Sequence, residues 1–373
     1  MSDDRDKTCN TKIVKWVLDT RNLWCIPGDF KAREEVQVLR KVASRALNLL
    51  SGKEQESVLR YYHVKDAKMS LASFLLKHLV ITKYMSIPWT KSLISIDRYG
   101  KPYLILDDSQ PLHLDFNVSH QAGVVILFAA ITNRIGVKVG TDIVCVNERR
   151  QEDYKHIDTY GFFNWLSIFE EVLADLELSS LRGGSLSLED VGINIQGAEL
   201  TSSGKDILDK CERRNQIISL PILINGAPSE IQLDSNVVID IKLRQFYASW
   251  CLRESYIKMT GEALSAPWLK DLEILQVKAP KPSKDTTVDL QIGEKINTFA
   301  INLKSKESKR SRVTNVTMDL TSLGLNYLVA GTICTAKCEC VPEIINMGEW
   351  QILDVLKDVI EVAEANLNEA IGV

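Results

Sequence analysis

The same order of secondary structure occurs twice in this chain, once in each half. A region of helical spacing, a turn rich in Gly and Pro, and several short β-type runs follow one another within residues 32–135 and again within 160–335. Repetition of one order of elements indicates two related lobes that both contain helices and strands. We therefore expect an α+β protein with a first lobe over residues 1–135 and a second lobe over residues 136–373.

Hydrophobic periodicity separates helices from strands in the first part of the chain. Apolar residues recur every three to four positions in the helical segments, whereas they alternate or run continuously in the strands. The expected helices are 32–49, 54–62 and 67–84, and the expected strands are 13–24, 103–106, 123–131 and 136–146. Tyr99-Gly100-Lys101-Pro102 forms a turn between the two groups, because Gly and Pro interrupt regular structure.

The second lobe contains a segment of different character. Gly, Ser, Asn and Asp are frequent in residues 180–235, and Pro221 and Pro228 interrupt its apolar runs. We interpret this segment as a partly ordered insertion. A strong helix is expected after it, followed by more β-type runs, at residues 240–260 and then 271–278, 296–303 and 326–335.

Two further segments follow the insertion. The basic run at residues 304–312 is typical of a solvated loop, although it also fits a nuclear-import or nucleic-acid patch. A terminal helix is expected at 349–370, with Trp350 and Leu353 on its apolar face.

The composition limits the partners of the chain. The formal net charge of −4 gives no overall field that would hold nucleic acid or an anionic membrane, so an anionic ligand must meet a local cluster of cations. The N-terminus is polar, and no run approaches the about 18 uncharged apolar residues of a membrane span. The eight cysteines fit neither a CxxC nor a zinc-finger pattern, which favours reduced thiols in a cytoplasmic protein.

Three short segments place polar residues within apolar surroundings. The first contains Asn117, Ser119 and His120, just before the strand at 123–131. An imidazole, a hydroxyl and backbone N–H groups at the start of a strand can together hold a phosphate. Alternatively, the same residues simply close a turn.

The second segment contains Asp142 between β-branched residues of an expected strand. A buried carboxylate is costly unless it binds something, and a carboxylate beside phosphates is the usual ligand of Mg²⁺. The alternative is that Asp142 ends the strand or caps a turn.

The third segment contains Glu254 and Lys258, which share one face of a helix because they are four positions apart. The carboxylate can meet a metal ion while the ammonium meets a neighbouring phosphate. An ordinary surface pair of opposite charges has the same spacing, so this alternative also stays open.

The order of these segments resembles one enzyme family. Phe-Asn-x-Ser-His at 116–120, Gly-x-Asp-Ile at 140–143 and Trp-x-x-Arg-Glu-Ser-x-x-Lys at 250–258 resemble the large subclass of 4′-phosphopantetheinyl transferases, the type that activates surfactin synthetase. Shorter matches are Tyr61-Tyr62-His63, Asp66-Ala67-Lys68, Ile87-Pro88-Trp89 and Gly100-Lys101-Pro102. The resemblance covers residues 13–146 and 243–265, and the length and the insertion are similar to those of fungal members.

This resemblance implies a fold of two α+β lobes related by a pseudo-twofold axis, with coenzyme A in the cleft between them. It implies transfer of the 4′-phosphopantetheine group from coenzyme A to a serine of apo carrier proteins, with release of 3′,5′-ADP. The implied carriers are acyl, peptidyl and aminoadipate-reductase carrier domains, and we expect a monomer. A module of the same fold that only binds coenzyme A or carrier protein is the alternative.

The resemblance also assigns roles to residues. Mg²⁺ is implied between Asp142 and Glu254, with Glu254 and Lys258 as catalytic residues that handle the serine proton and the charge on the leaving group. The implied coenzyme-binding residues are Arg98, Lys101, Pro102, Asn117, Ser119, His120 and Lys258.

The chain departs from the family pattern at several positions. Many bacterial members have an acidic residue where this chain has Val144, so the metal site is short of one carboxylate, and Gln121 or water is expected to fill the gap. The Phe-(Ser/Thr)-x-x-Glu element has only a loose counterpart around Phe169 and Glu170-Glu171. The first Lys of the third motif is Arg253, which keeps the charge.

Overall fold

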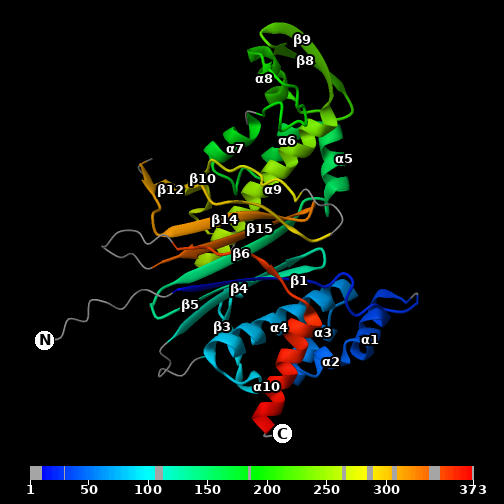
Figure 1. Cartoon of the computed structure of the whole chain (residues 1–373), viewed down its shortest axis with the longest axis vertical. Coiled ribbons are helices and arrows are strands. Elements are labelled where there is room, and N and C mark those ends of the chain that lie inside the picture. The colour runs from blue at the N-terminus through cyan, green and yellow to red at the C-terminus, as the bar shows by residue number, and fades with distance from the viewer. Residues whose placement is uncertain are drawn as a thin grey trace, which may run out of the picture.

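The computed structural model describes residues 11–28, 30–105, 112–183, 186–262, 266–283, 289–304, 309–335 and 345–371. Helices and strands are both abundant, as expected for an α+β protein (Figure 1). No helix among the described residues is both long and apolar enough to cross a membrane. Cys9, Cys338 and Cys340 lie outside the described ranges, and the five other cysteines form no disulfide with one another.

Two four-stranded sheets form the centre of the molecule. The first sheet has the order β16-β1-β5-β4, and the second has the order β11-β14-β15-β6. The strands of the first sheet are β16 (Gln351–Ile352), β1 (Lys12–Asp19), β5 (Val124–Thr132) and β4 (His113–Gln121). The strands of the second sheet are β11 (Ile292–Ile296), β14 (Val316–Leu323), β15 (Tyr327–Cys334) and β6 (Lys138–Cys145).

Strand β5 explains how the two sheets are layered, because all nine of its residues are buried. Alternate side chains such as Leu127 join the core formed with the helices, and the intervening ones such as Phe128 join the core shared with the second sheet. A strand covered on both faces needs no polar alternation, which is the reason for the continuous apolar run seen in the sequence. The two sheets therefore pack face to face.

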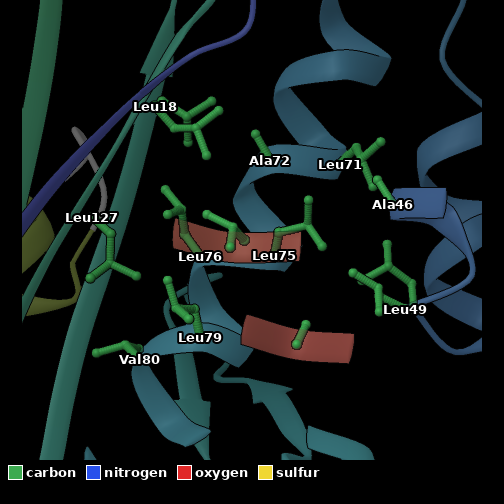
Figure 2. Close-up of a cluster of buried hydrophobic side chains, with 14 of the residues drawn as sticks. Leu18, Ala46, Leu49, Leu71, Ala72, Leu75, Leu76, Leu79, Val80 and Leu127 are labelled. Carbon is green, nitrogen blue, oxygen red and sulfur yellow. The ribbon is translucent and has the colours of Figure 1, made fainter. Parts of the chain in front are cut away.

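Each sheet is covered on its outer face by one long helix, α4 (Val64–Met85) on the first and α9 (Ser235–Thr260) on the second (Figure 1). Figure 2 shows Leu76 and Leu79 of α4 on the side of β5, near Leu127, and Leu71 on the other side, near Ala46. Shorter helices complete the first layer: α1 (Ala32–Val42), α2 (Ser44–Leu47) and α3 (Gly52–Leu59). The helix expected at 32–49 is thus divided into two at Ala43.

Several short elements follow each long helix in the chain. The short elements after α4 are η1 (Trp89–Lys91), β2 (Ile94–Ile96) and β3 (Pro102–Leu104). Those that follow α9 are η2 (Leu269–Asp271), β10 (Leu272–Leu275), β12 (Ala300–Lys304) and β13 (Arg310–Arg312). Strand β13 pairs with β12, so the end of the basic run is a strand and not the expected loop.

The C-terminal elements return to the first sheet. Strand β16 pairs in parallel with β1, and α10 (Glu361–Ile371) places Ala363 in the core of the first lobe after a π-helical turn at Val355–Ile360. Trp350 and Leu353 precede this helix, so the expected helix at 349–370 begins too early. Although the sequence assigns residues after 350 to the second lobe, their contacts are with the first.

Residues 180–235 are more regular than the expected partly ordered insertion, and their status as an insertion stays a prediction. This region contains α8 (Ser202–Lys210) and a sheet of β7 (Ala198–Leu200), β8 (Ile217–Ile224) and β9 (Ala227–Asp234), preceded by α5 (Arg150–Tyr160), α6 (Phe162–Ser167) and α7 (Asp175–Arg182). These elements share one apolar core with the start of α9. Leu220 and Ile222, two positions apart on β8, both point into that core. Pro228 lies on the edge strand β9, where the missing N–H of proline need not remove a hydrogen bond between strands.

Candidate functional site

The two sheets meet along the strands β4 and β6, which lie side by side (Figure 1). Three side chains of β4 accept hydrogen bonds from backbone N–H groups of β6. Asp115 accepts from Val139 N at 2.6 Å, Asn117 from Thr141 N at 3.1 Å, and Gln121 from Cys145 N at 2.9 Å. This row of bonds, which we call the seam, fixes the register of the two strands and sets Ser119 opposite Asp142.

Asp142 is the centre of a buried polar cluster at the seam. Its Oδ1 accepts from Ser119 Oγ at 3.0 Å and from Lys258 Nζ at 2.5 Å, and Lys258 Nζ also donates to Ser119 Oγ at 3.0 Å. The three residues come from β4, β6 and α9. The alternatives in which Asp142 merely ends a strand and Lys258 belongs to a surface pair are therefore excluded.

The charges of Asp142, Glu254 and Lys258 act on one another. Burial opposes the charge on Lys258, but the charge and hydrogen bond of Asp142 together with the charge of Glu254 outweigh it and raise the lysine pKa. Burial also raises the pKa of the half-buried Glu254, and the Asp142 charge raises it further. Within the described part of the chain, Glu254 has no hydrogen-bond or ion-pair partner.

Gly140 brings α9 close enough to β6 for these contacts. A Cβ atom on Gly140 would lie 2.1 Å from the carbonyl oxygen of Ser255 and 2.2 Å from the backbone nitrogen of Met259. Any other residue would push the helix away from the strand. The Gly of the Gly-x-Asp motif thus positions Lys258 against Asp142.

We expect Gly140→Ala to lower the free energy of unfolding by about 1–3 kcal/mol, the usual cost of overpacking a close contact. Urea unfolding measures this change. Gly52→Ala is the matched control, because a Cβ there meets nothing within 4 Å and Ala favours the helix. Equal stability of the two variants would contradict the role given to Gly140.

Predicted binding residues lie at different places around the seam. His120 follows Ser119 on β4 and is exposed, whereas Asn117 is buried and bonded to β6. Arg98 lies in the turn between β2 and β3, with its guanidinium 4.5 Å from the ring centroid of Tyr99. Pro102 begins β3.

Lys101 and Gln121 also have protein partners. Lys101 Nζ donates to Asp115 Oδ2 at 2.7 Å and to the carbonyl oxygen of Val139 at 2.9 Å, so it binds both sides of the seam. Both ends of the Gln121 amide are also engaged, since the oxygen accepts from Cys145 N and Nε2 donates to Glu148 at 2.6 Å.

The donor set fits a hard divalent cation held by few protein ligands. No group of three or more His, Cys, Asp or Glu residues arranged for a metal exists in the described ranges. Asp142 and Glu254 nevertheless supply two carboxylates whose charges act on each other, and Glu254 has no cation bonded to it. Mg²⁺ takes one or two carboxylates and completes its shell with water and phosphate oxygens, so these two residues fit it.

One ion pair behind the site was not found from the sequence. Arg253 is completely buried, and it donates to Glu177 of α7 and to the carbonyl oxygens of Leu269 and Leu272, both at 2.7 Å. Glu177 also accepts from Ala174 N at 2.9 Å, which caps the N-terminus of α7. Arg253 therefore stabilises the helix that presents Glu254 and does not face the site.

The loose counterpart placed around Phe169 and Glu170-Glu171 stays a prediction, and a stretch nearby has the full spacing of the Phe-(Ser/Thr)-x-x-Glu element. Glu170 and Glu171 are exposed and pair with Arg182 and Lys270 on the surface. Leu173-Ala174-Asp175-Leu176-Glu177 has the spacing of the Phe-(Ser/Thr)-x-x-Glu element, with the acidic residue at the capping position. This spacing was visible in the sequence. It was overlooked because Ala174 stands where the element has a Ser or Thr whose hydroxyl caps the helix.

Comparisons with known proteins agree with the resemblance. Residues 38–132 match the family model described as "4′-phosphopantetheinyl transferase, N-terminal". A 4′-phosphopantetheinyl transferase of Aureobasidium melanogenum is 39% identical over 85% of this chain and 89% of the relative, and 4′-phosphopantetheinyl transferase 1 of Fusarium mangiferae is 33% identical over 92% of each. An L-aminoadipate-semialdehyde dehydrogenase-phosphopantetheinyl transferase of Schizosaccharomyces pombe is 34% identical over 36% of this chain and 48% of the relative.

Proposed function

We propose a mechanism from the premise that this chain belongs to the family of 4′-phosphopantetheinyl transferases. It is an enzyme that transfers the 4′-phosphopantetheine group of coenzyme A to a serine of apo carrier proteins and releases 3′,5′-ADP. The observation that carries the mechanism is the meeting of Ser119, Asp142 and Lys258, from three separate elements. The carboxylate of Glu254, whose charge acts on Lys258, has no bonded partner among the described residues.

We propose that the two lobes are related by a pseudo-twofold axis. Three strands of the first sheet lie in the order β1-β5-β4, and three strands of the second lie in the corresponding order β6-β15-β14. In the chain, β1 comes before the long helix α4, and β6 comes before the long helix α9. Each long helix is followed by a Pro-Trp pair at a short 3₁₀ turn, Pro88-Trp89 after α4 and Pro267-Trp268 after α9. The cleft that takes coenzyme A would lie along the seam between the lobes.

We propose that Asp142 and Glu254 hold Mg²⁺ together with water. Gln121 is a weaker candidate than water for the position left by Val144, because both ends of its amide are already bonded. The metal, when bound, offsets charge on the diphosphate of coenzyme A. The transition state of phosphoryl transfer needs mostly positioning and charge stabilisation, which a few fixed charges can supply.

The residues of the chain have separate tasks in this mechanism. Lys258 offsets the negative charge that grows on the departing 3′,5′-ADP, and its raised pKa keeps it protonated. Glu254 takes the proton of the carrier serine as that oxygen attacks the phosphorus atom. Its half-buried carboxylate has a raised pKa, which favours a general base near neutral pH.

The mass of a carrier protein tests the function. Incubation of an apo carrier protein with this enzyme, coenzyme A and Mg²⁺ should add one phosphopantetheine group, which mass spectrometry detects. Bound coenzyme A without any gain in mass would instead favour the module that only binds. Acyl, peptidyl and aminoadipate-reductase carriers tested in parallel would show which class is served.

We expect His120→Ala to raise KM for coenzyme A about tenfold or more and to leave kcat nearly unchanged, as for loss of a charge-assisted contact. His120 is expected to meet a phosphate remote from the bond that breaks, so the contact is equal in ground and transition states. Steady-state kinetics with varied coenzyme A measure both constants. His113→Ala, at the other end of β4, is the control, and a normal KM with a collapsed kcat would place His120 at the reaction centre.

A further inference from the structure

Helix α9 is held against the second sheet by buried polar contacts that the mechanism does not use. Ser255 of the helix and Thr332 of β15 are both completely buried, and their hydroxyl oxygens lie 2.6 Å apart. One turn earlier, the Sγ of Cys251 lies 3.4 Å from the carbonyl oxygens of Asp142 and Leu328. Cys251 and Ser255 are four positions apart, so both contacts belong to one face of the helix.

The inventory of protons fixes the direction of the bond between the two hydroxyls. Ser255 Oγ donates to the carbonyl oxygen of Leu252 at 2.7 Å, and a serine hydroxyl has only one proton to donate. Toward Thr332 it can therefore only accept, so Thr332 Oγ1 is the donor. A buried hydroxyl is costly without a hydrogen-bond partner, so position 332 calls for a donor and not only for a β-branched shape.

Thr332 lies beside the close contact between α9 and β6. It pairs with Gly140 across the two strands, and Gly140 is the position where a Cβ would overlap the backbone of Ser255 and Met259. The close contact sets the distance between helix and sheet, whereas the hydroxyl bond sets the rotation of the helix. Successive side chains of a helix are about 100° apart, so a fixed Ser255 also fixes the direction of its neighbour Glu254.

Glu254 depends on this rotation more than Lys258 does. Lys258 Nζ is held directly by Ser119 and Asp142. Glu254 has no bonded partner among the described residues, although the charge of Asp142 acts on it. The place of its carboxylate therefore follows from the position of the helix alone.

We propose that Thr332 is a positioning residue of the transferase, which acts through Ser255 to hold Glu254 at the reaction centre. Thr332 itself touches neither metal nor substrate in this assignment. Misplacement of a catalytic group by about 1 Å can slow a reaction about a hundredfold, so a contact that sets the rotation of α9 has a large effect on the rate. The assignment rests on the proposed function, because the position of Glu254 matters only if this residue acts in the transfer.

Variants that separate the hydroxyl from the methyl group of Thr332 test the proposal. Thr332→Val keeps the shape and removes the donor, and we expect it to lower the maximal single-turnover rate at saturating Mg²⁺ at least about tenfold. The concentration of coenzyme A that gives half of this rate should stay within about a factor of two, because Lys258 keeps its own partners. Thr332→Ser keeps the donor and should transfer within about a factor of three of the wild-type rate, although loss of a buried methyl group lowers its melting temperature.

A double variant tests whether Thr332 acts through Ser255. Ser255→Ala should slow the transfer about as much as Thr332→Val, and the two together should slow it no further, because both remove the same bond. Thr321→Val is the matched control. Thr321 is completely buried in the same sheet, and its hydroxyl has no hydrogen-bond partner within the described ranges. It pairs with Val329, which lies in the core shared with the first sheet, so it faces away from α9 and its variant should transfer as the wild type does.

Three results would overturn the role of Thr332. They are a wild-type rate for Thr332→Val, rates that follow the melting temperatures of the variants and not the presence of the hydroxyl, and losses that multiply in the double variant. A wild-type protein that binds coenzyme A but never modifies a carrier would instead overturn the proposed function.

Discussion

Glu254→Gln lowers the rate of phosphopantetheine transfer at least about a hundredfold, the usual scale for loss of a positioned general base. The substitution keeps the size and one oxygen ligand but removes the charge and the basicity. Val144 cannot supply a second carboxylate beside Asp142, so no neighbouring group on β6 replaces Glu254. Single-turnover transfer to an apo carrier protein measures the rate without product release.

The response to Mg²⁺ separates the two tasks given to Glu254. A defect in metal binding alone recovers by mass action as the metal concentration rises, whereas the lack of a base does not. We expect high Mg²⁺ to restore only a minor part of the activity. Nearly full recovery would reduce Glu254 to a metal ligand and leave the proton to a metal-bound hydroxide. Glu369→Gln, exposed on α10, controls for loss of one negative charge.

Arg253→Met lowers the free energy of unfolding by about 3–5 kcal/mol, the usual cost of removing one partner of a buried ion pair. The side chains of Arg253 and Glu177 are 0% and 2% exposed, so the carboxylate left behind has no access to water. The carbonyl oxygens of Leu269 and Leu272 lose their donor as well. Urea unfolding followed by circular dichroism measures the change.

Two further variants make this stability prediction specific. The double variant Arg253→Met with Glu177→Met should recover a large part of the loss, because it leaves no unpaired buried charge. Lys210→Met removes the exposed pair with Asp206 and should cost at most about 1 kcal/mol. A loss for Arg253→Met no larger than that for Lys210→Met would show that the buried pair contributes little.

The sequence predicted the fold best where the local hydrophobic pattern matches the burial of the residues in the structure. The continuous apolar run at 123–131 predicted a strand, and β5 is a strand whose nine residues are all buried. Ser119, Asp142 and Lys258 are up to 139 positions apart, yet the resemblance placed them in one site and the structure brings them together. The tasks assigned to them in catalysis stay predictions.

The rest could not be predicted because it depends on contacts between distant segments. Lys101 has the sequence context of a coenzyme-binding residue, and only the position of β6 relative to β4 gives it Asp115 and Val139 as partners. Pro221 and Pro228 made residues 180–235 resemble a loop, whereas the core shared with α9 folds them into a sheet. Nothing local distinguishes a proline that ends a strand from one tolerated within it.

The pairing of β1 with β16 has a consequence for biosynthesis. Trp16 lies opposite Gln351, so the first sheet acquires its outer strand only after the residues of the second sheet have been translated. Domains usually fold in turn as they leave the ribosome, and contacts between residues far apart in sequence form slowly. Until then, the core residues of the first lobe that pack against Leu353, Val359, Ile360 and Ala363 would stay exposed to water, where chaperones that recognise apolar surface could bind them. Loss of residues 351–371 would leave that intermediate as the end point of folding.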